Sequence, residues 1–118
     1  MSVTDAVRKE LEKLCRGRRT RMHTFSPTMP THWSPQYVRH PGNGEAFSDD
    51  SAWTFIADLL GKGHEIQVIT LDKPPGKTGY VLKCDGYDGE KIYMKIMMGS
   101  GKVIGRSFHV SERKDRVQ

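Results

Sequence analysis

Cysteines and long apolar runs are scarce in this chain of 118 residues. Cys15 and Cys84 are the only cysteines, and no Cys-x-x-Cys spacing is present. This pattern favours free thiols in a reducing cytoplasm over a disulfide scaffold, with a bridge between the two as the minor alternative. No apolar run reaches the roughly 18 residues of a membrane-spanning helix, and the N-terminus has no apolar signal segment. We therefore expect a cytoplasmic protein with no membrane partner.

Signatures of metal and nucleotide sites are also missing. His23, His32, His40 and His64 match no standard zinc spacing with Cys15, so we interpret them as ordinary loop histidines. His64, just after a predicted helix, is a minor candidate for a place in an active cleft. The glycine-containing turns lack the P-loop pattern. The sequence thus predicts neither a metal nor a cofactor.

Acidic residues are fewer than basic ones in this chain. Lys and Arg total 19 against 14 Asp and Glu, which gives a net charge of +5. Excess positive charge attracts phosphate backbones, although a merely well-solvated basic surface would look the same. The length fits a single domain, residues 1–118, with one core.

Two amphipathic helices are predicted from apolar residues that recur every three or four positions. The first covers residues 3 to about 16, within an N-terminal part of residues 1–22, and Thr4 or Ser2 could cap it. The second starts after Ser48, a good N-cap, and ends near residues 61–63, where two glycines stand.

Four arginines crowd the end of the first predicted helix, at positions 16, 18, 19 and 21. Positive charge near a helix C-terminus is favourable in itself. Arg18 and Arg19 could also bind RNA phosphates or an acidic partner segment.

Regular patterns are absent from residues 23–47, which hold four prolines and therefore predict an irregular segment. Trp33, Tyr37 and Val38 indicate that part of this segment lies against the core, and Trp33 should fix it there. Residues 112–118 form a polar tail.

Periodicity of two follows the second helix, within a unit of residues 48–111. It predicts four strands, at residues 65–72, 79–85, 91–98 and 102–111. Their connectors are short enough only for antiparallel neighbours. The expected fold is α+β, with two helices packed on one face of a four-stranded antiparallel β-meander.

The last hairpin determines which side chains share a face. A three-residue loop at residues 99–101 would place Tyr93 opposite Ser107, Lys95 opposite Gly105, and Lys91 opposite His109. Residues paired across strands point to the same side, so these polar residues would share one face. The other face would be apolar, with Arg106 as its exception, and would contain Ile92, Met94, Ile96, Ile104, Phe108 and Val110.

The polar face carries groups suited to metal-independent RNA cleavage. His109 can transfer a proton near neutral pH. Lys91, Lys95 and Arg106 could stabilise a negatively charged phosphate, and Tyr93 could orient a hydroxyl or stack on a base. An ordinary solvated sheet face is the competing interpretation.

The segment Ile92-Tyr93-Met94-Lys95-Ile96, followed by Arg106-Ser107-Phe108-His109, resembles the C-terminal strands of small ribonuclease toxins of type II toxin–antitoxin systems. The likeness is to the MqsR branch within the RelE and barnase–EndoU–colicin group, and it spans about 20 residues. It implies a RelE-like ribonuclease fold in which Tyr93 and His109 are catalytic. His109 stands where the family has lysine, and Lys83 is a possible counterpart of a catalytic residue on the preceding strand.

These observations lead us to expect an endoribonuclease toxin that cleaves RNA, free or ribosome-associated, and is neutralised by a cognate antitoxin protein. The expected catalytic residues are His109, Tyr93, Lys95 and Arg106. The expected substrate-binding residues are Ser107, Lys83, Lys91, Arg18 and Arg19. The main alternative is a non-catalytic RNA- or protein-binding module of a phage or mobile element, and a weaker one is an inhibitor that blocks an enzyme's nucleic-acid channel.

Overall fold

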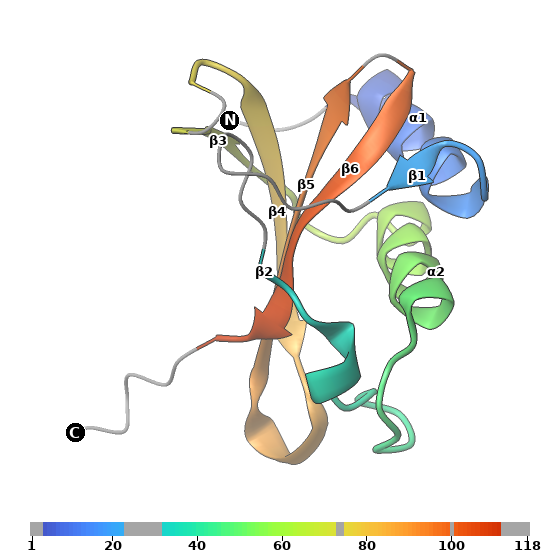
Figure 1. Ribbon diagram of the computed structural model, residues 1–118, viewed down its shortest axis with the longest axis vertical. Coiled ribbons are helices and arrows are strands. Elements are labelled where there is room, and N and C mark those ends of the chain that lie inside the picture. The colour runs from blue at the N-terminus through green and yellow to red at the C-terminus, as the bar shows by residue number, and fades with distance from the viewer. Residues whose placement is uncertain (1–3, 23–31, 73–74, 100, 112–118) are drawn as a thin grey trace.

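The structure is a computed structural model that describes residues 4–22, 32–72, 75–99 and 101–111, without the side chain of Asp88. Two helices, α1 (Asp5–Arg16) and α2 (Asp49–Gly61), lie on one side of a mixed six-stranded sheet (Figure 1). This arrangement confirms the predicted α+β class. Of the helices in the described ranges, none is long and apolar enough to cross a membrane.

Both helices begin at the predicted caps. The Thr4 hydroxyl accepts a hydrogen bond from the Val7 amide at 3.2 Å and so satisfies one free N–H at the start of α1. At α2, the Ser48 hydroxyl accepts from the Ser51 amide, and the Ser51 hydroxyl accepts from the Ser48 amide at 2.8 Å. This reciprocal capping box fixes the first turn of α2.

Four strands of the sheet follow one another in antiparallel pairs. They are β3 (Gln67–Thr70), β4 (Thr78–Asp85), β5 (Lys91–Gly99) and β6 (Lys102–Val110). Their bounds lie close to the predicted ones. The sheet order is β1-β6-β5-β4-β3, and β2 also pairs with β6. The prediction of a sheet with four antiparallel strands only is therefore incomplete.

The two additional strands, β1 (Arg21–Met22) and β2 (His32–Trp33), both run parallel to β6. They complete the edge of β6 that a four-stranded meander would leave open, which satisfies backbone groups that otherwise face solvent. The irregular segment predicted for residues 23–47 is thus wrong in its second part. There the chain contains β2, a short 3₁₀ helix η1 (Pro35–Tyr37) and a bridge between Arg39 and Ala46. Residues 23–31 and the polar tail at 112–118 lie outside the described residues.

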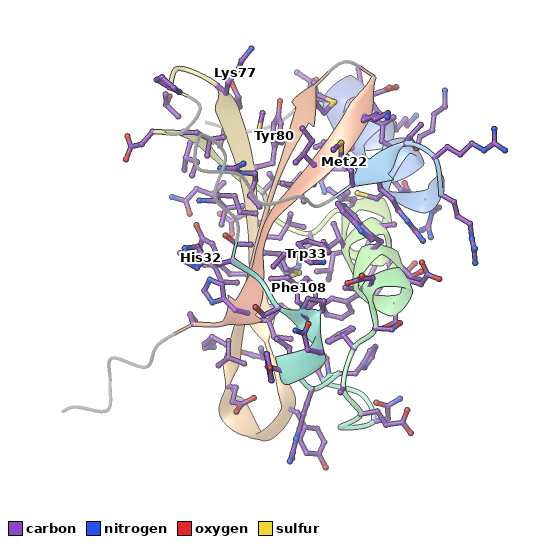
Figure 2. The ribbon with its side chains drawn as sticks, viewed as in Figure 1. Met22, His32, Trp33, Lys77, Tyr80 and Phe108 are labelled. Carbon is purple, nitrogen blue, oxygen red and sulfur yellow. The ribbon has the colours of Figure 1, made fainter. Side chains whose placement is uncertain are left out.

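The main core fills the space between the helices and the sheet. Its largest buried side chains include Trp53 and Leu60 of α2 and Phe108 of β6. Trp33 packs beside them, with its ring centroid 4.7 Å from that of Trp53 and 5.5 Å from that of Phe108. The predicted packing of this segment on the core is confirmed for Trp33, whose side chain Figure 2 shows on the helix side of the sheet, and for the buried Val38. It is wrong for Tyr37, which is 80% exposed.

The β5–β6 hairpin has a different register from the predicted one. Gly99 pairs with Lys102 across a two-residue loop, and the register then shifts by one residue, so that Ile96 pairs with Gly105 but Lys95 pairs with Ser107. Arg106 is the extra residue of this β-bulge. The predicted three-residue loop is therefore wrong, and so are its pairs. Tyr93 lies opposite His109.

The bulge also corrects the assignment of side chains to faces. Before it, Ile104 lies with Met97 and Leu71 in a small second cluster, away from the main core. Gly105 pairs with Ile96 and faces Trp33, so it does not lie opposite Lys95 on the polar face as predicted. At the bulge, Arg106 turns to line the same cavity as Lys95, so it is not an exception on the apolar face.

Gly105→Ala should destabilise the protein by about 1–3 kcal/mol, the usual cost of overpacking a tight core. A Cβ at this position would stand 2.5 Å from the Trp33 ring, so the ring and β2 must move. Urea unfolding followed by circular dichroism measures the change. Gly99→Ala is the matched control, since its Cβ would meet only the end of Ile104 at 3.6 Å. Equal stability of the two variants would contradict the packing of Trp33 on Gly105.

Candidate functional site

Polar side chains form a row across the sheet face that points away from the helices, which we call the outer face. The row consists of Lys83 on β4, Tyr93 on β5, His109 on β6 and His32 on β2. Lys83 pairs with Tyr93, and Tyr93 pairs with His109. The rings of Tyr93 and His109 stack with centroids 5.4 Å apart, and the ring of His32 meets that of His109 edge-on at 6.1 Å.

His109 is held in one tautomer by a local hydrogen bond. Its Nδ1 lies 3.1 Å from the backbone oxygen of Val110. A carbonyl oxygen can only accept, so Nδ1 carries the hydrogen in this bond and Nε2 is left as the basic nitrogen. Stacking on Tyr93 restrains the plane of the imidazole ring. His109 is therefore arranged to take up a proton at Nε2.

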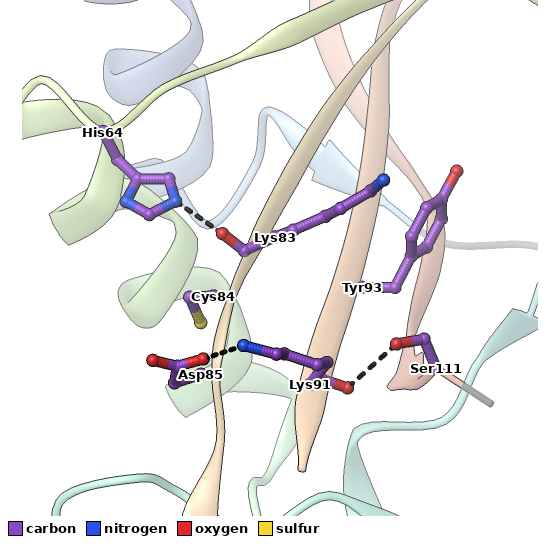
Figure 3. A pocket seen from close by; sticks show the side chains of 7 residues that line it. All are labelled: His64, Lys83, Cys84, Asp85, Lys91, Tyr93 and Ser111. Carbon is purple, nitrogen blue, oxygen red and sulfur yellow. Dashed lines mark hydrogen bonds and ion pairs between the residues drawn. The ribbon is translucent and has the colours of Figure 1, made fainter. Parts of the chain in front are cut away.

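Tyr93 supplies a phenol that keeps its proton at neutral pH. Burial raises the pKa of its hydroxyl, because a phenolate is poorly solvated there. Figure 3 shows the side chain of Lys83 extended toward the Tyr93 ring, and its Nζ lies 5.9 Å from the ring centroid. Tyr93 can therefore donate a hydrogen bond or position its neighbours, but it is a poor base.

Two cations meet beside this row. Lys95 and Arg106 line a cavity of about 350 Å³ that His32 and Asp72 also border. Burial, and then the charge of Arg106, lower the pKa of Lys95, while Asp72 acts in the opposite direction. Arg106 is almost wholly buried, and burial lowers its pKa. Neighbouring cations with reduced solvation favour an anion placed between them.

A larger pocket of about 850 Å³ opens at the other end of β4 and β5 (Figure 3). Its lining residues are His64, Lys83, Cys84, Asp85, Lys91, Tyr93 and Ser111. His64 donates from Nε2 to the backbone oxygen of Lys83 at 2.6 Å, so it anchors the α2–β3 connection to β4. The pocket thus shares Tyr93 and Lys83 with the polar row.

Two predicted substrate-binding residues have partners within the sheet. Lys91 pairs with Asp85 across β4 and β5 and forms an ion pair with it, which lowers the pKa of that carboxyl. Ser107 is 2% exposed and lies in register between Lys95 and His32. Lys91 therefore borders the larger pocket and not the cavity of Lys95, and Ser107 is a buried residue between Lys95 and His32.

Arg18 and Arg19 lie apart from the row. They belong to the α1–β1 connection, on the helix side of Figure 1. Arg18 is mostly exposed and lies 3.6 Å from Asp50 of α2. Arg21 makes a closer pair with the same carboxylate at 2.6 Å. The arginine cluster is thus partly balanced by acidic neighbours.

His32 is the residue of the outer face that sequence reasoning missed. The Pro-rich context led to its interpretation as an ordinary loop histidine. One signal was available: Trp33 was expected to pack on the core, and successive residues of an extended segment point to opposite sides. Figure 2 shows His32 and Trp33 on opposite sides of β2.

Thiolate and metal chemistry find no support in the described ranges. Cys15 and Cys84 are free thiols, and desolvation by burial raises their pKa values to about 12 and about 11. Within those ranges, no group of three or more histidine, cysteine or acidic residues could hold a metal ion. His40, for example, accepts from the Gly42 amide and packs on aromatic rings.

Alkylation of the native protein should reflect these raised pKa values. Only the thiolate reacts, so iodoacetamide at pH 8 should modify Cys84 on the order of 100-fold more slowly than an unfolded thiol of ordinary pKa. The rate should keep rising with pH until about 11. Mass spectrometry of the native and urea-unfolded protein measures both rates. Equal rates at pH 8 would contradict the burial of Cys84.

No protein-family model matches the chain, and no curated protein or solved structure that was compared with it matches either.

The chemistry available on the outer face comes from a basic imidazole nitrogen, a protonated phenol and two cations. An imidazole can transfer a proton at a phosphate ester, and cations can stabilise the negative charge that develops there.

Proposed function

We propose that this protein is a metal-independent endoribonuclease whose active site is the outer face of the sheet. The observation that carries the proposal is the stacking of His109 on Tyr93 beside the cavity lined by Lys95 and Arg106. The resemblance of the β5 and β6 segments to RelE-like ribonuclease toxins supports the same residues, and the α+β layout is compatible with a RelE-like fold.

In the proposed reaction, His109 Nε2 takes the proton of a ribose 2′-hydroxyl. The 2′-oxygen then attacks the neighbouring phosphorus atom, and the bond from phosphorus to the 5′-oxygen breaks as that oxygen receives a proton. Lys95 and Arg106 stabilise the charge that develops on the phosphate oxygens. The products are a 2′,3′-cyclic phosphate and a 5′-hydroxyl.

Tyr93 and Lys83 would bind the part of the RNA that lies over β4 and β5, next to His109. The protonated Tyr93 hydroxyl can donate to the ribose or to a phosphate oxygen. The pocket in Figure 3 begins at Tyr93 and has room for a nucleobase. Lys83 at its wall would contact the neighbouring phosphate as a point charge.

Purified protein incubated with RNA in EDTA tests this function. We expect the wild type to cleave the RNA and Lys95→Gln to lower the rate roughly 10²-fold, the usual effect of removing one group that stabilises an oxyanion. Lys102→Gln, at the exposed end of β6, is the matched control and should cleave at the wild-type rate. No cleavage by the wild type, or equal rates for Lys95→Gln and the wild type, would overturn the proposal.

The toxin role and the antitoxin partner belong to the same proposal. Lys83, Lys95 and Arg106 give the outer face positive charge, which suits coverage by an acidic segment of an antitoxin. Expression in bacteria should then arrest growth, and co-expression of the antitoxin should restore it. Normal growth with abundant folded wild-type protein would count against the toxin role.

A non-catalytic binding module is the second candidate, and the exposure of Arg18 favours it. Such a module would use the α1–β1 connection instead of the outer face. Charge reversal by Arg18→Glu with Arg19→Glu should then abolish RNA binding in a filter-binding assay, whereas Lys95→Gln should not. For the ribonuclease, the double charge reversal should leave the rate of RNA cleavage close to that of the wild type, whereas Lys95→Gln should lower it.

A further inference from the structure

His32 occupies a position that the fold builds with several independent contacts. β2 pairs in parallel with β6, with His32 opposite Ser107 and Trp33 opposite Phe108. The amide of Ser34 donates to the Phe108 oxygen at 3.0 Å. Trp33 inserts between Gly105 and Trp53 on the helix side, so its neighbour His32 is left on the outer face. A side chain fixed in this way is not an ordinary loop histidine.

The position of His32 places a second imidazole both beside His109 in the polar row and in the cavity lined by Lys95 and Arg106. The centroids of the His32 and His109 rings are 6.1 Å apart. His32 also lines the cavity that contains Lys95 and Arg106. A group that transfers a proton works within about 3 Å of the oxygen that it serves. Rings at this spacing can therefore serve two oxygens of one phosphodiester that is held by the cations.

We infer that His32 is the second proton-transfer group of the site and acts as the general acid. This inference rests on the proposed ribonuclease function. His109 Nε2 takes the proton from the 2′-hydroxyl as the new bond from the 2′-oxygen to phosphorus forms. His32, as imidazolium, gives its proton to the 5′-oxygen as the bond from phosphorus to that oxygen breaks. After one turnover His109 carries an additional proton and His32 has lost one. His109 then releases its proton to solvent and His32 takes one up from solvent, which restores the starting state.

The surroundings of His32 explain how the imidazolium would be stabilised. The charged and titratable groups around it are His109 and Arg106 on β6, Lys95 on β5, and Asp72 after β3. Lys95 and Arg106 are cations, and Asp72 is the acidic residue of this set. A bound phosphodiester adds negative charge, so substrate binding itself favours the protonated form.

His32→Gln tests the inference through the pH dependence of kcat/KM in EDTA. The wild type should show a bell-shaped profile, because the base must be neutral and the acid protonated. His32→Gln should lower the rate at the optimum roughly 10²-fold and remove the alkaline limb, which reports loss of the proton from the acid. His40→Gln is the matched histidine control from the same segment and should keep both the rate and the profile. A His32→Gln profile with both limbs and a rate within about twofold of the wild type would overturn the inference.

Titration of the histidine Cε1–H resonances with inorganic phosphate gives a reading that does not depend on cleavage. Phosphate should move the titrations of both His32 and His109 to higher pH and leave that of His40 unchanged. A response of His109 without one of His32 would overturn the inference even if the RNA is cleaved. If both histidines respond but the wild type cleaves no RNA, the proposed function is overturned, and the role of His32 as a general acid with it. The titration would then show only that both imidazoles contact a bound phosphate.

Discussion

His109→Gln is expected to lower kcat/KM for RNA cleavage roughly 10²- to 10⁴-fold, the range that a positioned general base contributes. Glutamine keeps much of the volume of histidine but cannot take up a proton at neutral pH. The hydrogen bond from Nδ1 to Val110 and the stacking on Tyr93 prepare Nε2 for this one task. Single-turnover cleavage of a labelled RNA in EDTA measures the loss directly.

The effect of His109→Gln should be chemical and not structural. His109 is only half-buried, so the urea midpoint of the variant should stay close to that of the wild type. His40→Gln is the matched control and should retain activity. Cleavage by His109→Gln within a few-fold of the wild type would show that another group removes the 2′-proton.

Phe108→Ala should have the largest effect on stability, with a loss of about 3–5 kcal/mol in the free energy of unfolding. Phe108 is fully buried, and its ring centroid lies 5.0 Å from that of Phe47 and 5.5 Å from that of Trp33. Truncation leaves a cavity where β2, β6 and the helix layer meet, so it should also loosen His32 and His109 and lower activity.

Equilibrium urea unfolding gives the free energy for Phe108→Ala, and Tyr37→Ala is its control. Tyr37 is 80% exposed, and surface substitutions usually change stability by no more than about 0.5 kcal/mol. A loss below about 1 kcal/mol for Phe108→Ala would contradict its place at the centre of the core.

The helices and the core could be predicted because local signals determine them. Ser48 and Thr4 are strong caps, and Trp53, Ile56 and Leu60 recur at the helical period, so α2 needs no tertiary information. The apolar side of β5 alternates with its polar side, which placed Ile92 and Met94 in the core and Tyr93 and Lys95 opposite them. The polar set on the outer face is therefore largely the predicted one.

The cross-strand pairs between the polar residues of β5 and β6 could not be predicted. The two-residue loop shifts the register by one residue, and the bulge then restores the alternation of polar and apolar faces. A two-residue loop alone would mix polar and apolar residues on both faces. The extra residue at Arg106 restores the alternation beyond the bulge, which leaves His109 on the polar face but opposite Tyr93. The same bulge carries Arg106 to the cavity of Lys95, a position that no pattern of period two could give.

His32 could not be placed for a different reason. β1 and β2 have two residues each, too few to show a period, and parallel pairing with β6 depends on contacts across the whole chain. Trp33 was the available clue, because an extended segment with a buried tryptophan presents its neighbour to the other side. Arg18 and Arg19 illustrate the reverse case: a cluster of charges is evident in the sequence, but the α1–β1 connection that carries it lies beside α2, where Arg18 is 3.6 Å from Asp50.

One chimeric RNA tests the ribonuclease proposal most directly. Its cleavage sites are first mapped with wild-type protein in EDTA, and the ribose 5′ to one scissile phosphate is then replaced by 2′-deoxyribose. We expect cleavage to disappear at that site alone, and the fragments from the other sites to end in 2′,3′-cyclic phosphate, because the attacking group is the neighbouring 2′-hydroxyl. Cleavage that continues at the deoxy site, or a requirement for a divalent metal, would contradict proton-transfer catalysis by His109.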